Sequence, residues 1–472
     1  MSTVECDSYR SYSNVSLTGF YRFSNIVNRS MKMAAVEQSP AVVPVNLLKE
    51  GPPGPQEMLS LPNLLNIRES LAIAESLASA SLMTSPAAKR RLRARKIELG
   101  LGEEPGYEPP RHLLLYLVRM GSFSSAPKIL NEDTQDNDVD LPEKMSREEL
   151  IDHCEQKLEG SPRLVRRKFT PVMDGNLEDK DKNSDDERIR ILQWNVLSQA
   201  LGQNNDSFVC CPDEALEWKR RRYHMVQEIV SYNPDVVCLQ EVDHFEFLKK
   251  ALKTQGYQGT FFPKPDSPCV YIKDNNGPDG CAIFFREDKF KLIDTQTRIL
   301  EVWRVQSNQV AILVTLEERR SGKRVCIATT HLKARNGALL STLRNEQGKD
   351  LLEFVDANAR GAPVILCGDF NAEPSEPIYS TVMNHESLAL GSAYSAKHNQ
   401  EPSYTTWKIR EEGEVCHTID YVFYSKDRLN VEAVLKFPTG EEIGQDRVPS
   451  LKYPSDHFSL VCDFSYKDPK SE

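Results

Sequence analysis

After Arg188 the chain carries its apolar residues in short runs, and each run adjoins a polar residue. Six runs rich in Val, Ile, Leu and Cys cover residues 188–196, 235–240, 324–330, 363–367, 417–424 and 455–462. Short, almost wholly apolar runs are typical of strands buried on both faces, so that only their ends meet water. The pattern predicts stacked sheets whose strand ends share one rim.

A different period marks the helices that should cover these sheets. Residues 215–232 place apolar side chains three and four positions apart, and residues 338–359 repeat that spacing. Ser321-Gly322 separates two strand-like runs and predicts a hairpin. The expected fold class is therefore an α/β sandwich.

The first 185 residues have the composition of a largely disordered region. Residues 51–55 read Gly-Pro-Pro-Gly-Pro, and the acidic, polar stretches at 131–140 and 178–187 lack the apolar residues that a core needs. Residues 64–82 have helical periodicity and predict one short helix. We therefore expect a mostly disordered region at 1–185 and a folded domain at 186–468.

Charge limits the kinds of partner. The formal net charge is -10 and the pI is about 5.6, which argues against a protein that binds nucleic acid by bulk electrostatics. The basic run at 89–96 suits a nuclear signal, a partner patch or simply a solvated face.

Composition also bears on the compartment. Residues 8–36 are rich in Ser, with four basic residues and no acid, which is typical of a mitochondrial address, whereas Glu5 and Asp7 argue against one. The eleven cysteines include no Cys-x-x-Cys pair and no cluster with zinc spacing, so we expect no structural zinc and a reducing compartment. No apolar stretch is long enough to predict a membrane span. The expected location is the cytoplasm.

The polar residues beside the runs form a set suited to phosphate chemistry. Glu241 offers a hard anionic oxygen and Asn195 a neutral one, which are ligands that Mg²⁺ takes while it keeps several waters. Asp369 and Asn371 can face the same site, one activating water and the other donating to a phosphoryl oxygen. His331 can donate to the same phosphoryl group.

His457 needs a partner that fixes its tautomer, and the carboxylate of Asp420 would orient the ring and stabilise the imidazolium. Each of these residues alone has an ordinary explanation, because a single His or Glu beside a strand is usually a solvated surface residue. Six in equivalent positions are better explained together. Phosphoryl transfer requires in-line positioning and charge neutralisation, so the set predicts magnesium-dependent hydrolysis of phosphate esters.

Six motifs resemble those of the endonuclease/exonuclease/phosphatase superfamily in order and spacing. They are Gln193-Trp194-Asn195, Leu239-Gln240-Glu241-Val242, Thr330-His331-Leu332, Gly368-Asp369-Phe370-Asn371, Ile419-Asp420-Tyr421 and Ser455-Asp456-His457. The resemblance implies a four-layered α/β/β/α sandwich. It also implies Glu241 as main metal ligand supported by Asn195, Asp369 aligning the attacking water, Asn371 and His331 holding phosphoryl oxygens, and an Asp420-His457 pair stabilising the transition state.

Within that superfamily, four segments closely resemble the nocturnin family in its insect form. They cover residues 257–265, 275–281, 330–335 and 404–410. Nocturnins resemble the carbon-catabolite-repressor deadenylases. The resemblance implies removal of the 2′-phosphate from NADP⁺ and NADPH to give NAD⁺ and NADH, with poly(A)-specific 3′ exoribonuclease activity as the alternative.

Basic residues in and beside these segments favour the dinucleotide, because they suit a compact ligand with several phosphates. A polynucleotide track would also need aromatic side chains for stacking, of which one is obvious here. Lys333 and Arg335 would leave one face of an extended segment after His331, toward phosphates that are not cleaved. The expected substrate site consists of Lys264, Asn276, Lys333, Arg335, Trp407, Lys408 and Arg410.

A third hypothesis is a non-catalytic adaptor, which would bind RNA-decay or metabolic partners through the N-terminal region and keep an inert sandwich as a scaffold. A decayed enzyme normally loses its metal ligands or its His/Asp groups. Here every one of them is present in the sequence, so such a role would accompany catalysis.

Overall fold

The computed structural model describes residues 141–172, 188–204, 207–273 and 275–467. The helix expected at 64–82 and the basic run at 89–96 lie outside the described residues. Among the residues described, no helix is both long and apolar enough to cross a membrane.

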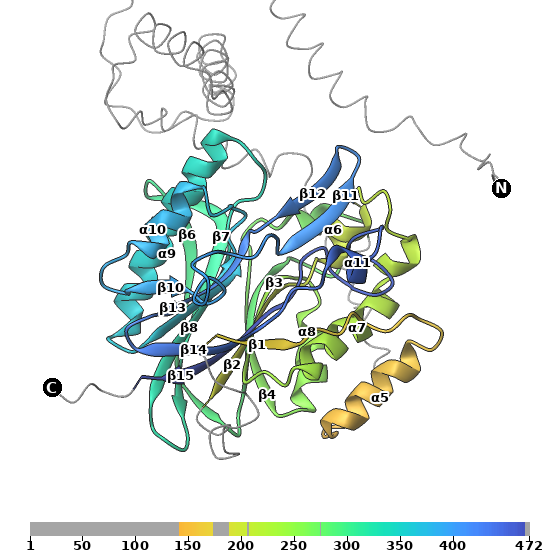
Figure 1. Cartoon of the computed structure of the whole chain (residues 1–472), viewed down its shortest axis with the longest axis horizontal. Coiled ribbons are helices and arrows are strands. Elements are labelled where there is room, and N and C mark those ends of the chain that lie inside the picture. The colour runs from red at the N-terminus through yellow and green to blue at the C-terminus, as the bar shows by residue number, and fades with distance from the viewer. Residues whose placement is uncertain (1–140, 173–187, 205–206, 274, 468–472) are drawn as a thin grey trace, which may run out of the picture. The chain divides into compact units, whose positions relative to one another are not determined.

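Two mixed sheets form the centre of the molecule (Figure 1). The first, in the order β1-β14-β15-β2-β3-β5-β4, comprises β1 (Phe169–Pro171), β2 (Ile189–Asn195), β3 (Val236–Val242), β4 (Tyr257–Pro263), β5 (Gly280–Arg286), β14 (Leu429–Leu435) and β15 (Leu460–Tyr466). The second, in the order β10-β13-β9-β8-β7-β6, comprises β6 (Phe290–Val302), β7 (Val305–Glu318), β8 (Arg324–His331), β9 (Val364–Asp369), β10 (Leu390–Ser392) and β13 (Asp420–Ser425). A separate hairpin pairs β11 (Thr406–Arg410) with β12 (Gly413–His417).

Helices cover the outer face of each sheet (Figure 1). The first sheet packs against α5 (Arg147–Lys157), α7 (Trp218–Ser231) and α8 (Phe245–Lys253), and the second against α9 (Ala338–Ala359) and α10 (Pro377–Met383). Shorter helical segments are α6 (Gln199–Asn204), η3 (Asp213–Leu216), η4 (Pro268–Tyr271) and α11 (Gly440–Ile443).

Three apolar clusters separate the four layers. Leu192 and Leu239 pack toward α7 and α8, whereas Ile191 and Cys238, one position away on the same strands, pack between the two sheets. A third cluster lies between the second sheet and α9. Full burial of such side chains stabilises the fold by about 1.5–3 kcal/mol each, so the alternation fixes which face of each strand points inward. The four-layered α/β/β/α sandwich is confirmed.

The sequence pattern placed most elements well. The helix expected at 338–359 is α9, and the hairpin expected at Ser321-Gly322 joins the antiparallel strands β7 and β8. The helix expected from residue 215 begins at Trp218 as α7, because η3 occupies the preceding residues.

The strand ends converge on one rim of the sandwich. β2 and β3 are parallel and in register at Asn195 and Gln240, and β8 and β9 are parallel and in register at His331 and Asp369. β13 runs antiparallel to β9 and starts at Asp420, opposite Asp369. β15 starts next to the end of β2. Residues far apart in sequence thus reach the same edge.

Two backbone features shape this rim. Glu241 lies in a β-bulge at the end of β3, with a φ of 55°, and a bulge re-aims the side chain that it carries. Gly368 lets β9 approach β8 closely, because a Cβ at this position would lie 2.5 Å from the carbonyl oxygen of Thr330. The backbone at this edge therefore determines the direction of the Glu241 side chain and the close pairing of β8 with β9.

Residues 141–172, on the N-terminal side of the expected boundary at 186, include α5 and β1. Ser146 caps α5 through a reciprocal hydrogen-bond pair with Glu149. Leu150 and Cys154 bury one face of α5 in the cluster that contains α7, and β1 pairs with β14. This segment packs against the first sheet and its helices.

Candidate active site

Asn195 and Glu241 lie side by side at the ends of two neighbouring parallel strands. Asn195 Nδ2 donates to Glu241 Oε1 at 3.0 Å and to Asp369 Oδ2 at 2.9 Å. Asn195 Oδ1 accepts from the backbone N of Leu197 at 3.0 Å, and Glu241 Oε2 accepts from the backbone N of Ser198 at 3.1 Å. The Asn195 amide therefore bridges a carboxylate from each sheet.

His457 and Asp420 form the pair expected from the sequence. His457 Nδ1 lies 2.9 Å from Asp420 Oδ2, which also accepts from Thr405 Oγ1 at 2.6 Å. Burial disfavours the imidazolium, but the carboxylates of Asp420, Asp456 and Asp369 outweigh it and raise the pKa of His457 to about 9. The ring is therefore a cation at neutral pH, and Asp420 fixes its orientation.

Asp369 lies between two histidines. Its Oδ2 is 3.6 Å from His331 Nε2 and 3.8 Å from His457 Nε2, and its Oδ1 accepts from the backbone N of Asn371 at 2.9 Å. Burial and the neighbouring Asp420 carboxylate raise the pKa of Asp369 to about 7, although His457 opposes them. Asn371 has a φ of 50°, a left-handed conformation that asparagine tolerates.

His331 is a neutral donor in this arrangement. Burial, together with the charges of Lys264 and His457, holds the pKa of His331 well below its usual value. Lys264 Nζ lies 3.4 Å from His331 Nδ1 and donates to Asp279 Oδ2 at 2.6 Å. An ammonium facing Nδ1 leaves the ring proton on Nε2, on the side of Asp369.

Asp456 is a site residue that the sequence reasoning missed, although it lies inside the Ser455-Asp456-His457 motif. Its Oδ2 accepts from Lys408 Nζ and lies 3.7 Å from His457 Nε2 and 3.9 Å from Arg410 Nη2. Burial opposes the charge, but Lys408, His457 and Arg410 hold the pKa of Asp456 well below its usual range. Lys408 and Arg410 are thus linked to His457 through the Asp456 carboxylate that lies between them.

Lys333 and Arg335 lie in the loop after β8. Within the described part of the chain, neither has a carboxylate within ion-pair distance. Arg344 Nη1 donates to the carbonyl oxygens of both residues, at 3.0 and 2.7 Å, and holds the loop. Arg335 has a φ of 80°, so the segment is not extended there, and the simple alternation argued from sequence does not apply.

Trp407 and Asn276 face other contacts. On β11, Trp407 alternates with Lys408 and so points away from Asp456. Its ring lies 4.0 Å from the guanidinium of Arg447, and its Nε1 donates to Glu414 at 2.6 Å. Asn276 Nδ2 donates to the carbonyl oxygen of Asp243 at 2.9 Å. Among the described residues, neither side chain makes a hydrogen bond to Asp369, Asp420 or His457.

One group of side chains at the rim could hold a metal ion. Ligand atoms of Asp369, Asp420 and His457 lie within 4.8 Å of one another, and all three residues are buried. Asp420 Oδ1 is buried with no hydrogen-bond partner among the described residues. Glu241, the ligand expected from sequence, lies next to this group through Asn195.

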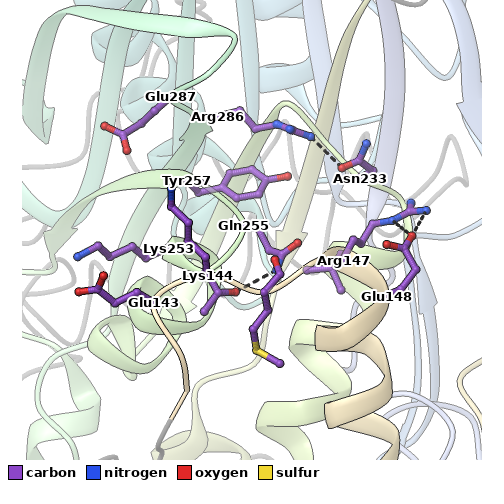
Figure 2. Close-up of a pocket in the computed structure, with 14 residues that line it drawn as sticks. Glu143, Lys144, Arg147, Glu148, Asn233, Lys253, Gln255, Tyr257, Arg286 and Glu287 are labelled. Carbon is purple, nitrogen blue, oxygen red and sulfur yellow. Dashed lines mark hydrogen bonds and ion pairs between the residues drawn. The ribbon is translucent and has the colours of Figure 1, made fainter.

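A cavity of about 710 Å³ lies at the opposite end of the first sheet (Figure 2). It is lined where β4 begins and β5 ends, by Tyr257 and Arg286 among others. Figure 2 shows that Arg286 bonds to Asn233 and that Arg147 bonds to Glu148. Its lining holds no histidine, and the group of side chains that could hold a metal ion lies at the rim instead.

Comparisons with known proteins agree with this geometry. Residues 192–457 match the model of the endonuclease/exonuclease/phosphatase family. The chain is 52% identical to nocturnin of Drosophila melanogaster, over 84% of this chain and 73% of that protein, and 48% identical to nocturnin of Homo sapiens, over 69% and 75%. The structure of the human nocturnin catalytic domain with bound sulfate anion is 42% identical, covers 65% of this chain and 99% of that one, and superposes with a TM-score of 0.54.

Proposed function

The chain belongs to the nocturnin family, within the endonuclease/exonuclease/phosphatase phosphoesterases, and on this premise we propose that it removes the 2′-phosphate of NADP⁺ and NADPH. The products would be NAD⁺ or NADH and inorganic phosphate. The proposal rests on the two kinds of group at the rim, one suited to the hydrolysis of a monoester and the other to binding further phosphates.

The first kind supports hydrolysis. Asp369, with its pKa near neutrality, is suited to accept the proton of the attacking water. His331, protonated on Nε2, and Asn371 are the proposed donors to the phosphoryl oxygens. His457, charged and oriented by Asp420, would stabilise the negative charge that builds up as the ester bond breaks.

The donor set fits a hard dication. Buried carboxylates crowd together, the pKa of Asp369 is raised by burial and by Asp420, and Asp420 Oδ1 lacks a partner among the described residues. Oxygen-rich sites of this kind are typical of Mg²⁺. We propose that Glu241 holds it at the edge of this group, with Asn195 orienting the Glu241 carboxylate. When bound, the ion would neutralise charge on the phosphoryl group.

The second kind of group carries the choice of substrate. Lys264 is buried next to His331. Burial lowers the pKa of Lys333, and the neighbouring charges of Arg335 and Lys264 lower it further. Lys333 and Arg335 have no neutralising carboxylate among the described residues. Two neighbouring cationic side chains beside the phosphate that is cleaved suit the binding of the pyrophosphate of a dinucleotide. This unneutralised pair is the observation that carries the proposal.

The surroundings of Trp407 argue against a polynucleotide track. Arg447 lies over one part of its ring, and Tyr404 packs at 4.8 Å from it. A base would have to displace these contacts before it could stack, whereas single-strand tracks present open aromatic faces. Poly(A) hydrolysis therefore remains the alternative, and an adaptor role would accompany the enzyme and not replace it.

The test is release of inorganic phosphate from NADPH by the purified chain with Mg²⁺, with the Glu241→Gln variant as the inactive control. We expect NADH to appear in step with phosphate, and chelation to stop both. Absence of NADH formation under conditions where a simple phosphomonoester is hydrolysed would refute the choice of substrate but not the phosphoesterase activity.

A further inference from the structure

One face of α7 meets the loop that carries Asp456 and His457. Arg221 and Glu228 are seven positions apart on α7, which is about two helical turns, so their side chains leave the same face. Both residues are 1% exposed. Arg221 bonds to the N-terminal end of residues 453–459, which we call the catalytic loop, and Glu228 bonds to both of its ends.

Arg221 holds the N-terminal end of this loop. Its four acceptors are the carbonyl oxygens of Pro454 (2.8 Å), Val196 (2.7 Å) and Leu197 (2.5 Å) and the side-chain oxygen of Gln199 (2.7 Å). Val196 and Leu197 directly follow Asn195. One planar guanidinium therefore joins the catalytic loop to the segment after β2.

Glu228 holds both ends of the loop. Its Oε1 accepts from Tyr453 Oη at 2.9 Å and from Ser459 Oγ at 2.9 Å. It also accepts from Arg167 Nη2 at 2.6 Å, and Arg167 Nη1 donates to the carbonyl oxygen of Ser459 at 2.8 Å. Tyr453 Oη in turn accepts from the backbone N of Ser459 at 2.9 Å. The network closes the loop at its base.

The charge of Arg221 is not explained by an ion pair. Among the described residues no carboxylate lies within salt-bridge distance of it, and burial lowers its pKa although the charges of Asp243, Asp456 and Glu241 oppose this. A buried cation held only by neutral oxygens is costly, and apolar residues usually stabilise such a position better. Its geometry suits the holding of two segments in register.

We propose that Arg221 and Glu228 are positioning residues, which fix the catalytic loop so that His457 faces the Asp369 carboxylate and Asp456 lies beside the His457 ring. His457 receives further support from Trp194, whose Nε1 donates to the His457 carbonyl oxygen at 2.7 Å. The inference uses the proposed phosphoesterase function for its kinetic test only. Its second test needs no substrate.

The perturbation is Arg221→Lys, with Arg220→Lys as the matched control. Lysine keeps the charge but replaces the fork by one ammonium, which cannot serve four acceptors on two segments. Arg220 precedes Arg221 on α7 and bonds instead to Ser161 and Glu214, away from the loop. Glu228→Gln is the second variant, because it keeps the shape of the side chain and removes the charge.

For Arg221→Lys we expect kcat on NADPH to fall about 10- to 100-fold with KM changed less than about two-fold, since small displacements of catalytic groups have such effects. In the substrate-free protein, amide hydrogen exchange followed by mass spectrometry should become faster in residues 453–459 and stay unchanged in β15. Glu228→Gln should change both readouts in the same direction, and Arg220→Lys should match the wild type.

Three results would overturn the proposal: kcat retained in both loop variants, kcat lost without faster exchange in the loop, or faster exchange throughout the molecule. Faster exchange everywhere would mean that Arg221 and Glu228 only stabilise the fold. If the wild type fails to hydrolyse NADPH, the proposed substrate is wrong, and the exchange comparison still decides whether α7 fixes the loop.

Discussion

Arg335→Ala separates dinucleotide binding from the chemistry at the phosphoryl group. Arg335 is exposed, and its backbone is held by Arg344, so removal of its side chain should leave the loop in place. A charge-assisted hydrogen bond contributes about 1.5–3 kcal/mol, and exposure to solvent puts Arg335 at the lower end. Since about 1.4 kcal/mol corresponds to a factor of ten, kcat/KM on NADPH should fall about ten-fold.

The assay compares two substrates on the same preparations. NADPH carries the pyrophosphate that Arg335 is proposed to bind, whereas 2′-AMP keeps the scissile monoester and lacks the pyrophosphate. We expect the variant to match the wild type on 2′-AMP. Arg324→Ala is the control, because Arg324 is an exposed arginine at the opposite end of β8, paired with Glu317.

Equal losses on both substrates would place Arg335 in the chemistry and refute its role in binding the distal phosphates. If the variant kept full activity on NADPH but degraded poly(A) more slowly, poly(A) and not the dinucleotide would be the substrate. Equal behaviour of the Arg335 and Arg324 variants would show that a general change of charge explains the result.

Glu241→Gln should abolish phosphate release and leave the melting temperature nearly unchanged, because Glu241 lies at the rim and not in a core; near-full turnover with Mg²⁺ would contradict its role as a ligand. Asp420→Asn combined with His457→Ala should cost little more in kcat than the worse single change, since the two act as one unit; additive losses would mean separate roles. The rate should rise as pH passes about 7, where Asp369 loses its proton, and fall as pH passes about 9, where His457 loses its own. Asp420→Asn should move both limbs to lower pH, because the Asp420 carboxylate raises both pKa values; an alkaline limb that stays in place would refute the pairing.

The local sequence pattern was enough for the elements and for much of the rim. Apolar runs located β2, β3, β8 and β9, and parallel pairing then brought Asn195, Glu241, His331 and Asp369 to one edge. Periodicity located α9 to the residue. These features depend on the spacing of neighbours along the chain, which a sequence displays directly.

What the sequence did not reveal depends on contacts between distant residues. Asp456 is bound by Lys408 from β11, forty-eight positions away, and no local pattern indicates that contact. The face of Trp407 follows from the register of the β11–β12 hairpin, and Arg335 leaves the extended conformation while its loop is held by Arg344 on α9. Residues 141–172 join the folded domain through the pairing of β1 with β14, a contact between segments more than 250 positions apart.

The central claim, that this phosphoesterase acts on NADP(H), is tested most directly by one product assay on one preparation. Equal phosphate concentrations of NADPH and of poly(A) RNA would be incubated with the chain and Mg²⁺, with Glu241→Gln run in parallel. We expect NADH and inorganic phosphate from NADPH, intact poly(A), and neither reaction with the variant. Release of AMP from poly(A) by the wild type alone, with NADPH left unchanged, would contradict this claim.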